Sequence, residues 1–207
     1  MLRDISVAVD GRTPEWPGDT PYSCGWTWEM ARGASVNVSA ITMSPHVGTH
    51  ADAPLHVGDG GYATEHLNLD HFIGRCVVLD VRDLDGDIEF ADLERRGLPT
   101  SAHRVLLKTG RTIADGRFPN HWPAVTPACT RPLGGRGLAL LGVDCPSVDL
   151  RESKTLDTHK ALFDQGRSVL ENLDLRAIEA GEYGLIALPP RLVGLDAAPV
   201  RAVLRPL

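Results

Sequence analysis

Cys76-Val-Val-Leu-Asp-Val81 is the first of four compact apolar runs that decide the fold of this 207-residue chain. The other three, each bounded by turn residues, are 105–109, 138–143 and 183–188. Short runs of this apolarity are typical of strands buried on both faces of a sheet, although periodicity alone does not distinguish them from buried helix. A fifth segment, 35–43, alternates as a strand does and contains β-branched residues. The sequence therefore predicts a largely buried sheet.

Helical patterns are fewer and lie between or beside these runs. Segment 87–96 carries spaced apolar residues behind an acidic first turn, and 175–180 has the pattern of a short helix. Segment 158–165 follows Asp157, a suitable N-cap, and precedes Gly166, which stands where a C-terminal glycine belongs. We expect three short helices at these places.

Two long stretches, 10–25 and 115–137, are rich in Pro and Gly and are predicted to be irregular. We interpret them as loops within one domain rather than as linkers between domains, because the segments that they separate each lack a complete set of secondary elements. Strands interspersed with a few helices indicate an α/β fold, with the strand pairing left open. We expect residues 1–207 to form a single domain.

The charge balance excludes some classes of partner. The chain has 21 Lys and Arg against 27 Asp and Glu, a net charge of −6, which disfavours nucleic acid and anionic membrane surfaces. The longest nearly apolar stretch, 137–143, is far shorter than the roughly 20 residues of a membrane-spanning helix. Four scattered cysteines without a C-x-x-C pair are typical of reduced, mostly buried thiols. We therefore expect a cytoplasmic protein with neither a nucleic-acid nor a membrane partner.

The stretch that carries chemistry is Ser44-Pro-His-Val-Gly-Thr-His-Ala-Asp-Ala-Pro-Leu-His56. Its prolines and glycine exclude a helix, and in extended chain His46, His50, Asp52 and His56 share parity and project to one side. Histidine and carboxylate suit Zn²⁺, Mn²⁺ or Fe²⁺. The alternative is a turn with ordinary hydrogen-bonding histidines, but four such groups in eleven residues favour a metal site. Three protein ligands would leave coordination positions open, as catalytic sites do.

Three residues elsewhere are candidates for the same site. An aspartate can bridge two metals, and His159 and Glu171, twelve residues apart across the helix predicted at 158–165 and Gly166, could supply a second cluster. Spacing alone does not decide this. Trp16, between Glu15 and Pro17, could either cover the edge of the core or line a pocket. No Gly-x-Ser-x-Gly elbow and no dinucleotide-binding loop in the required context is present.

The motif at 44–56 resembles the signature of the metal-dependent cyclase/amidohydrolase family, and within it the branch of the bacterial kynurenine formamidases. Further blocks resemble other parts of that branch and together cover most of the chain: Trp16-Pro-Gly-Asp-Thr-Pro21, Gly142-Val-Asp-Cys-Pro-Ser-Val-Asp149, Glu152-Ser-Lys-Thr-Leu-Asp-Thr-His159, Leu185-Ile-Ala-Leu-Pro-Pro190 and Asp196-Ala-Ala-Pro-Val-Arg-Ala-Val-Leu204. The resemblance implies a swivelling-type β/β/α domain with a mixed central sheet or barrel and peripheral helices. It also implies a homodimer.

The resemblance assigns roles as well. It implies two Zn²⁺ ions per subunit, with Mn²⁺ or another divalent metal as alternatives. The first ion would be held by His46, His50 and Asp52, and the second by Asp52, His159 and Glu171, both carboxylates being shared. His56 would be the catalytic proton donor and acceptor. Trp16 would contact a small aromatic formamide substrate, and the implied reaction is hydrolysis of N-formyl-L-kynurenine to kynurenine and formate by an arylformamidase.

Two departures bear on the substrate rather than on the metal chemistry. Asn172 follows Glu171 where glycine is expected, and 111–123 matches the branch poorly. One alternative is therefore a related hydrolase of another small cyclic amide, imide or ester, such as isatin. The other is a non-catalytic metal-binding or ligand-binding module, against which the presence of His56 beside the other donors argues.

Overall fold

All four apolar runs form strands of one sheet. The structure is a computed structural model that describes all 207 residues. The runs correspond to β5 (Ile73–Asp80), β6 (Arg104–Lys108), β7 (Leu140–Val143) and β9 (Gly181–Ile186). The predicted strand at 35–43 is β3 (Val38–Thr42), which belongs to a separate hairpin with β2 (Ser23–Trp28).

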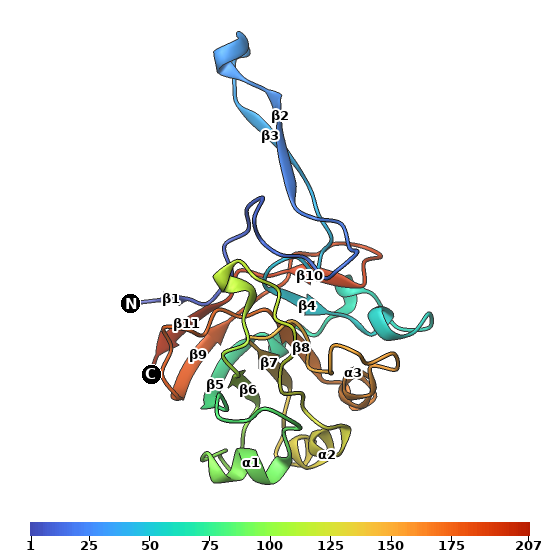
Figure 1. Cartoon of the computed structure of the whole chain (residues 1–207), viewed down its shortest axis with the longest axis vertical. Helices are drawn as coiled ribbons and strands as arrows, with labels where there is room; N and C mark the ends of the chain where they lie inside the picture. Colours follow the sequence, from blue (N-terminus) through green and yellow to red (C-terminus); the bar gives the residue numbers. More distant parts are fainter.

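The sheet has nine strands and mixed direction. Its remaining members are β1 (Arg3–Asp4), β4 (His50–Asp52), β8 (Ser168–Glu171), β10 (Ala197–Pro199) and β11 (Val203–Pro206). The order is β1-β11-β9-β5-β6-β7-β8-β4-β10. Strands β5 to β8 are parallel neighbours, and the flanking strands pair antiparallel. The sheet curls into half a barrel (Figure 1), which confirms the predicted mixed central sheet.

Alternating side chains of the central strands enter two different cores, because successive residues of a strand point to opposite faces. Val77, Val105 and Leu141 belong to a core shared with the helices. Val78 and Leu106 belong to a second core on the other face, together with Phe72 and Leu185. This explains why the runs at β5, β6 and β7 are continuously apolar. β9 is the exception, since most of its residues are only partly buried or exposed.

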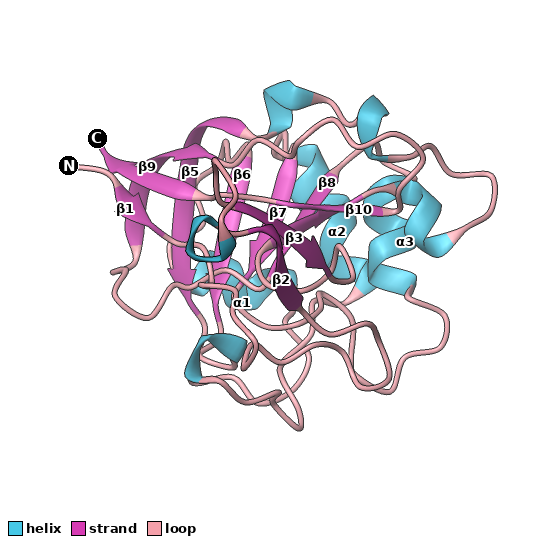
Figure 2. Cartoon of the chain, turned by 90° about the horizontal axis from the view of Figure 1, so that it is seen from above, coloured by secondary structure: helices cyan, strands magenta, loops and turns pink.

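Three short helices lie at the periphery of the sheet: α1 (Phe90–Arg95), α2 (Pro127–Gly135) and α3 (Asp157–Phe163). α2 packs against both α1 and α3 (Figure 2). The helices predicted at 87–96 and 158–165 are therefore confirmed. None of the helices is long and apolar enough to cross a membrane.

Two predictions of secondary structure were wrong. Segment 115–137 is not wholly irregular, because α2 lies within it. The Thr126 side chain accepts a hydrogen bond from the Cys129 N–H, and Pro127 occupies the first helical turn, where its missing N–H costs nothing. Segment 175–180 is a turn with one hydrogen bond from Ile178 N–H to Leu175 C=O. Both residues are buried in the second core, so burial rather than helical periodicity explains the apolar pattern.

The start of α3 also differs from the prediction. Its N-cap is Leu156, in the left-handed region at φ 50°, and Asp157 is the first helical residue. The carboxylate of Asp149, outside the helix, accepts hydrogen bonds from the N–H groups of Thr158 and His159 at 2.9 and 3.1 Å. A residue distant in sequence thus performs the capping that was expected of Asp157.

The β2–β3 hairpin projects away from the body of the protein (Figure 1). All residues of both strands are exposed, so Trp26 and Trp28 do not pack within the chain. At the base of the hairpin, the Ser44 N–H donates to the Thr20 C=O at 3.0 Å. The projection therefore begins and ends next to the segments that contain Trp16 and His46.

Gly142 shows how closely the second core approaches the sheet. A Cβ atom at this position would lie 2.5 Å from Leu106 Cδ2 and 3.0 Å from Leu173 Cδ1. We expect Gly142→Ala to lower the free energy of unfolding by about 1–3 kcal/mol, because it overpacks a closed core. Urea denaturation measures this. Gly11→Ala is the matched control, since nothing lies within 4 Å of its Cβ position; equal stability of the two variants would contradict the packing argument.

Candidate metal centre and active site

Strand β4 places two of the predicted ligands beside a third. His50 and Asp52 are two residues apart and share a face of the strand. β4 pairs antiparallel with β8, and His50 lies directly opposite Glu171 in the register. Directly opposed residues share a face of the sheet, so the glutamate joins the other two. Ala51 and Leu170, which alternate with them, enter the second core instead.

His46 and His56 reach the same place by different backbone. His46 lies in the turn before β4, and His56 lies on the 3-10 helix Pro54–Val57 after it. The extended-chain parity argument therefore holds for His50 and Asp52 and was wrong for the other two. The rings nevertheless converge, with the His46 centroid 4.8 Å from that of His50 and 4.5 Å from that of His56.

His159 joins from the first turn of α3. Its Nε2 lies 3.2 Å from Asp52 Oδ2 and 3.2 Å from Glu171 Oε1. The other oxygens of the two carboxylates face the first cluster: Asp52 Oδ1 is 3.2 Å from His46 Nδ1, and Glu171 Oε2 is 3.6 Å from His50 Nε2. The side chains therefore form two donor groups that share Asp52: His46–His50–Asp52 and Asp52–His159–Glu171.

The imidazoles of His46, His50 and His159 each place one ring nitrogen against a hydrogen-bond acceptor outside the two donor groups. His46 Nε2 lies 3.0 Å from Asp196 Oδ2, His50 Nδ1 is 2.9 Å from the Gly48 carbonyl, and His159 Nδ1 is 2.6 Å from Asp149 Oδ2. The other nitrogen of each ring faces the carboxylates of the cluster. This arrangement is typical of metal-ligating histidines, because the outer hydrogen bond fixes the tautomer and the ring orientation.

Sequence reasoning missed both outer carboxylates. Asp149 and Asp196 stand in blocks that carried the family resemblance, but no ligand-like spacing singled them out. Asp196 Oδ2 also lies 3.2 Å from His56 Nδ1, so one oxygen contacts two histidines. A third cluster, His46–His56–Asp196, therefore adjoins the other two.

The electrostatics of the cluster favour a cation. Asp52 is fully buried, and despite the cost of burial its histidine neighbours hold the pKa of its carboxyl well below the usual value. Burial opposes the charged form of His46 as well, but the neighbouring carboxylates of Asp196 and Asp52 raise its pKa to about 10. The pKa of His159 is raised too, against burial, by the charge of Glu171 and the bond to Asp149.

Two buried atoms in the cluster lack a hydrogen-bond partner, His50 Nε2 and Asp52 Oδ1. They lie 3.4 Å apart and both face the first donor group. Buried polar atoms are normally paired, and such an orphaned pair needs an explanation. A divalent cation would satisfy both atoms, so the donors present fit a metal ion.

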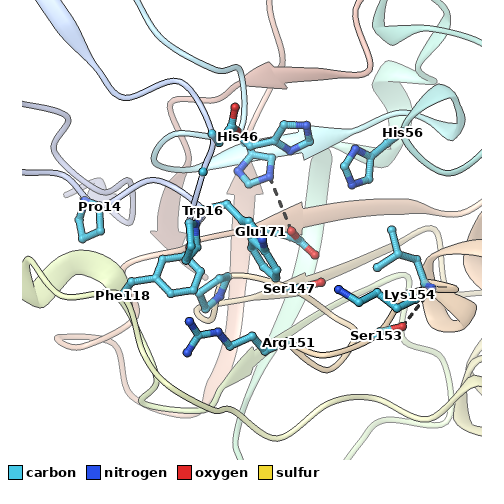
Figure 3. Close-up of a pocket in the computed structure, with 17 residues that line it drawn as sticks. Pro14, Trp16, His46, His56, Phe118, Ser147, Arg151, Ser153, Lys154 and Glu171 are labelled. Atoms are coloured by element: carbon cyan, nitrogen blue, oxygen red, sulfur yellow. Dashed lines mark hydrogen bonds and ion pairs between the residues drawn. The ribbon is translucent and has the colours of Figure 1, made fainter.

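A cavity of about 590 Å³ opens beside the clusters and is lined by His46, His56 and Glu171. Trp16 and Phe118 form an aromatic wall in it (Figure 3), with ring centroids 5.4 Å apart. Trp16 therefore lines a pocket, the second of the two interpretations left open. Phe118 comes from 111–123, so the poorly matching loop does contribute to the shape of the cavity.

Asn172 accounts for one departure from the family pattern. Its φ is 55°, in the left-handed region that favours glycine and that asparagine tolerates better than most residues. The Thr49 hydroxyl donates to its carbonyl at 2.5 Å. The backbone after Glu171 therefore keeps the conformation that a glycine would supply.

Comparison with known proteins agrees with this geometry. Residues 3–150 match the profile of the Cyclase family, described as "Putative cyclase". The chain belongs to this family. Over its whole length this cyclase-family chain is 45% identical to a kynurenine formamidase of Bordetella pertussis and 43% identical to one of Bordetella avium, and it covers 98% of each.

Solved structures give the same result for the fold. The cyclase-family chain superimposes with a TM-score of 0.82 on "predicted metal-dependent hydrolase from Bacillus stearothermophilus", at 28% identity and with 99% and 97% of the two chains covered. It also superimposes on an isatin hydrolase bound to the product analogue thioisatinate, with a TM-score of 0.84 and 100% and 92% covered. That pair is only 20% identical, so the match shows the fold alone.

Metal-free protein should lose stability as the pH rises above 6.5. The folded pKa of His46 is about 10 and the unfolded value is about 6.5, so its stabilisation is complete below pH 6.5 and is lost as the pH rises towards 10. We expect chelator-treated protein to be about 1–3 kcal/mol less stable at pH 8.5 than at pH 6.5, measured by urea unfolding.

His46→Asn should reduce this dependence, because it removes one of the two imidazoles whose pKa is raised in the folded protein. His66→Asn is the matched control, since the side chain of His66 is 67% exposed and lies outside the clusters. A pH dependence that persists unchanged in His46→Asn would contradict the assignment of the proton to this imidazole.

Proposed function

We propose that this chain is an arylformamidase that hydrolyses N-formyl-L-kynurenine to L-kynurenine and formate, in the breakdown of tryptophan. The observation that carries the proposal is a five-ligand donor cluster at one side of an aromatic-walled cavity, with His56 beside it. The names of the full-length relatives support the substrate. In this proposal residues 1–207 act as one hydrolase domain, and the unpaired state of all four cysteines supports work in the reducing cytoplasm.

We propose that the site holds two zinc ions. His46, His50 and Asp52 would hold the first, and Asp52, His159 and Glu171 the second. Imidazole and carboxylate donors suit zinc, although Mn²⁺ accepts the same groups. Bridging by both carboxylates is supported by the split of their oxygens between the two donor groups. When bound, the metals would supply Lewis acidity, which polarises a carbonyl and generates hydroxide near neutral pH.

The side chains around the cluster would perform the remaining tasks. His56 would take a proton from the attacking water and return it to the arylamine nitrogen, which leaves only once it is protonated. Asp196 accepts from His56 Nδ1 and so would direct Nε2 to this transfer. Trp16 and Phe118 would hold the aryl ring, a contact worth about 0.5–1.5 kcal/mol beyond the area that it buries.

Turnover with and without metal tests this function. We expect purified protein to hydrolyse N-formyl-L-kynurenine, to lose that activity on chelation and to regain it with Zn²⁺. Metal analysis should find about two ions per chain. Isatin and simple formanilides belong in the same assay, because preferential turnover of isatin would favour the related cyclic-amide hydrolase. Metal binding without turnover of any of them would indicate a non-catalytic module.

His56 provides a sharper test, because acid–base and ligand roles predict different results. We expect His56→Asn to retain both metals and to lose about 10²–10⁴-fold in kcat for the formamide. The loss should be smaller for a formyl ester of similar shape, whose leaving group needs less protonation. Loss of metal would make His56 a ligand instead, and near-normal formamide turnover with full metal content would exclude both roles.

We also propose that two copies of the chain form a homodimer through the β2–β3 hairpin. A hairpin without a packed face is marginally stable in water. Nevertheless this one exposes Trp26, Trp28 and Ile41, each close to 60%. Exposed apolar surface of this kind is typical of an interaction site. Because its base adjoins the segments of Trp16 and His46, an assembled hairpin would also steady the mouth of the cavity.

The hairpin variant Trp26→Ser/Trp28→Ser should therefore shift the protein from dimer to monomer. Light scattering coupled to size-exclusion chromatography measures the mass directly. Thr27→Ser is the matched control, because it lies between the two tryptophans on the same strand and removes only a methyl group. A monomeric wild type, or a double variant that stays dimeric, would contradict this interface.

A further inference from the structure

The side of the cavity away from His46 and His56 is cationic. Arg151 and Lys154 line it, and both come from the loop between β7 and α3 (Figure 3). In that view the Lys154 side chain points towards Ser147, and the Arg151 side chain extends beneath Trp16 towards Phe118. Neither residue belongs to any of the three donor clusters.

The charges of these two residues are not neutralised by the protein. The Arg151 guanidinium donates only to the Asn120 carbonyl and side-chain oxygen, at 3.2 and 3.3 Å, and neither atom is charged. Lys154 is exposed and makes no ion pair or side-chain hydrogen bond. Many other arginines of the chain, such as Arg82 and Arg176, are paired with carboxylates. The cavity therefore presents two free cations to whatever enters it.

Arg151 places its positive charge beside the aromatic wall formed by Trp16 and Phe118. Its guanidinium carbon lies 5.6 Å from the centroid of Phe118, whose ring packs edge-on against Trp16. A ligand ring held at this wall would bring a short substituent within reach of the guanidinium. Guanidinium groups bind carboxylates with two parallel hydrogen bonds, which is stronger and more directional than a single neutral bond.

We propose that Arg151 and Lys154 form a carboxylate-binding subsite that selects aromatic formamides with an anionic side chain. This inference rests on the proposed function and specifies its substrate class, since the amino-acid side chain of N-formyl-L-kynurenine carries a carboxylate that is ionised at neutral pH. Asp19 lines the same cavity and offers a negative charge to the ammonium group of that side chain. Isatin and simple formanilides have no group for this subsite.

Paired substrates test the subsite. N-formyl-L-kynurenine is compared with its α-carboxamide, which keeps the shape and the amine but has no negative charge. We expect Arg151→Gln to lower kcat/KM for the acid about 10- to 100-fold and to leave the amide within about twofold of wild type. Arg151→Lys should be intermediate, because it retains the charge without the fork. Lys154→Met should cost about 2- to 5-fold for the acid only, because this residue is exposed.

Arg131→Gln and Lys160→Met are the matched controls, since both are exposed on helices and neither lines the cavity. They should leave both substrates unchanged. Equal losses for the acid and the amide in Arg151→Gln would show a structural effect and overturn the subsite. Unchanged kinetics in both Arg151→Gln and Lys154→Met would overturn it as well.

Calorimetric binding of L-kynurenine and of its carboxamide separates this inference from the proposed function. We expect wild type to bind the acid at least 10-fold more tightly than the amide, and Arg151→Gln to lose most of that preference. If wild type prefers the acid but does not hydrolyse N-formyl-L-kynurenine, the proposed function fails and the subsite stands. If wild type binds the two equally, the subsite is refuted, whatever the turnover.

Discussion

The carboxylate of Asp52 is the constraint on which the rest of the site depends. It is completely buried, and a buried charge is very costly unless opposite charge or hydrogen bonds surround it. Histidines from three parts of the chain meet that need: His46 from a turn, His50 from the same strand and His159 from α3. Removing the carboxylate would remove the reason for their convergence.

Asp196 and Asp149, which accept hydrogen bonds from the candidate ligand histidines, suit the donor cluster to replace protons with a metal cation. Without metal, the carboxylates hold protons on His46 and His159, as the raised pKa values of both imidazoles indicate. The hydrogen bonds to Asp196 and Asp149 hold two of the rings in place. Binding of a metal at the proposed site would therefore require loss of these protons, with the ligands already converged. The Oδ2 atom of Asp196, which contacts His46, also contacts Nδ1 of His56 and so orients that ring as well.

The residues that line the cavity come from segments that are far apart in sequence. The donor cluster comes mainly from β4, β8 and α3, where hydrogen-bonded backbone limits movement. The aromatic wall and the two free cations come from loops, at 16, 118 and 151–154. Regular secondary structure thus positions the donor groups, while loops set the shape and charge of the cavity that, in our proposal, would distinguish one substrate from another.

The sequence by itself determined the central strands, two of the helices and the donor-rich segment of the candidate site. The continuously apolar runs at β5, β6 and β7 fit only between two cores, and donors as dense as those at 44–56 favour a metal site. Only the tertiary structure decided that Glu171 lies opposite His50, because strand register depends on long-range pairing and leaves no trace in spacing. The same holds for Asp196, which contacts His46 and His56 across most of the chain, and for Asp149, which contacts His159 across the loop that precedes α3. It holds too for α2, whose helix depends on a cap and a first-turn proline within a stretch whose composition predicts a loop. The exposed hairpin was unpredictable for a related reason: alternation shows that residues form a strand, but only the folded chain shows whether anything covers it.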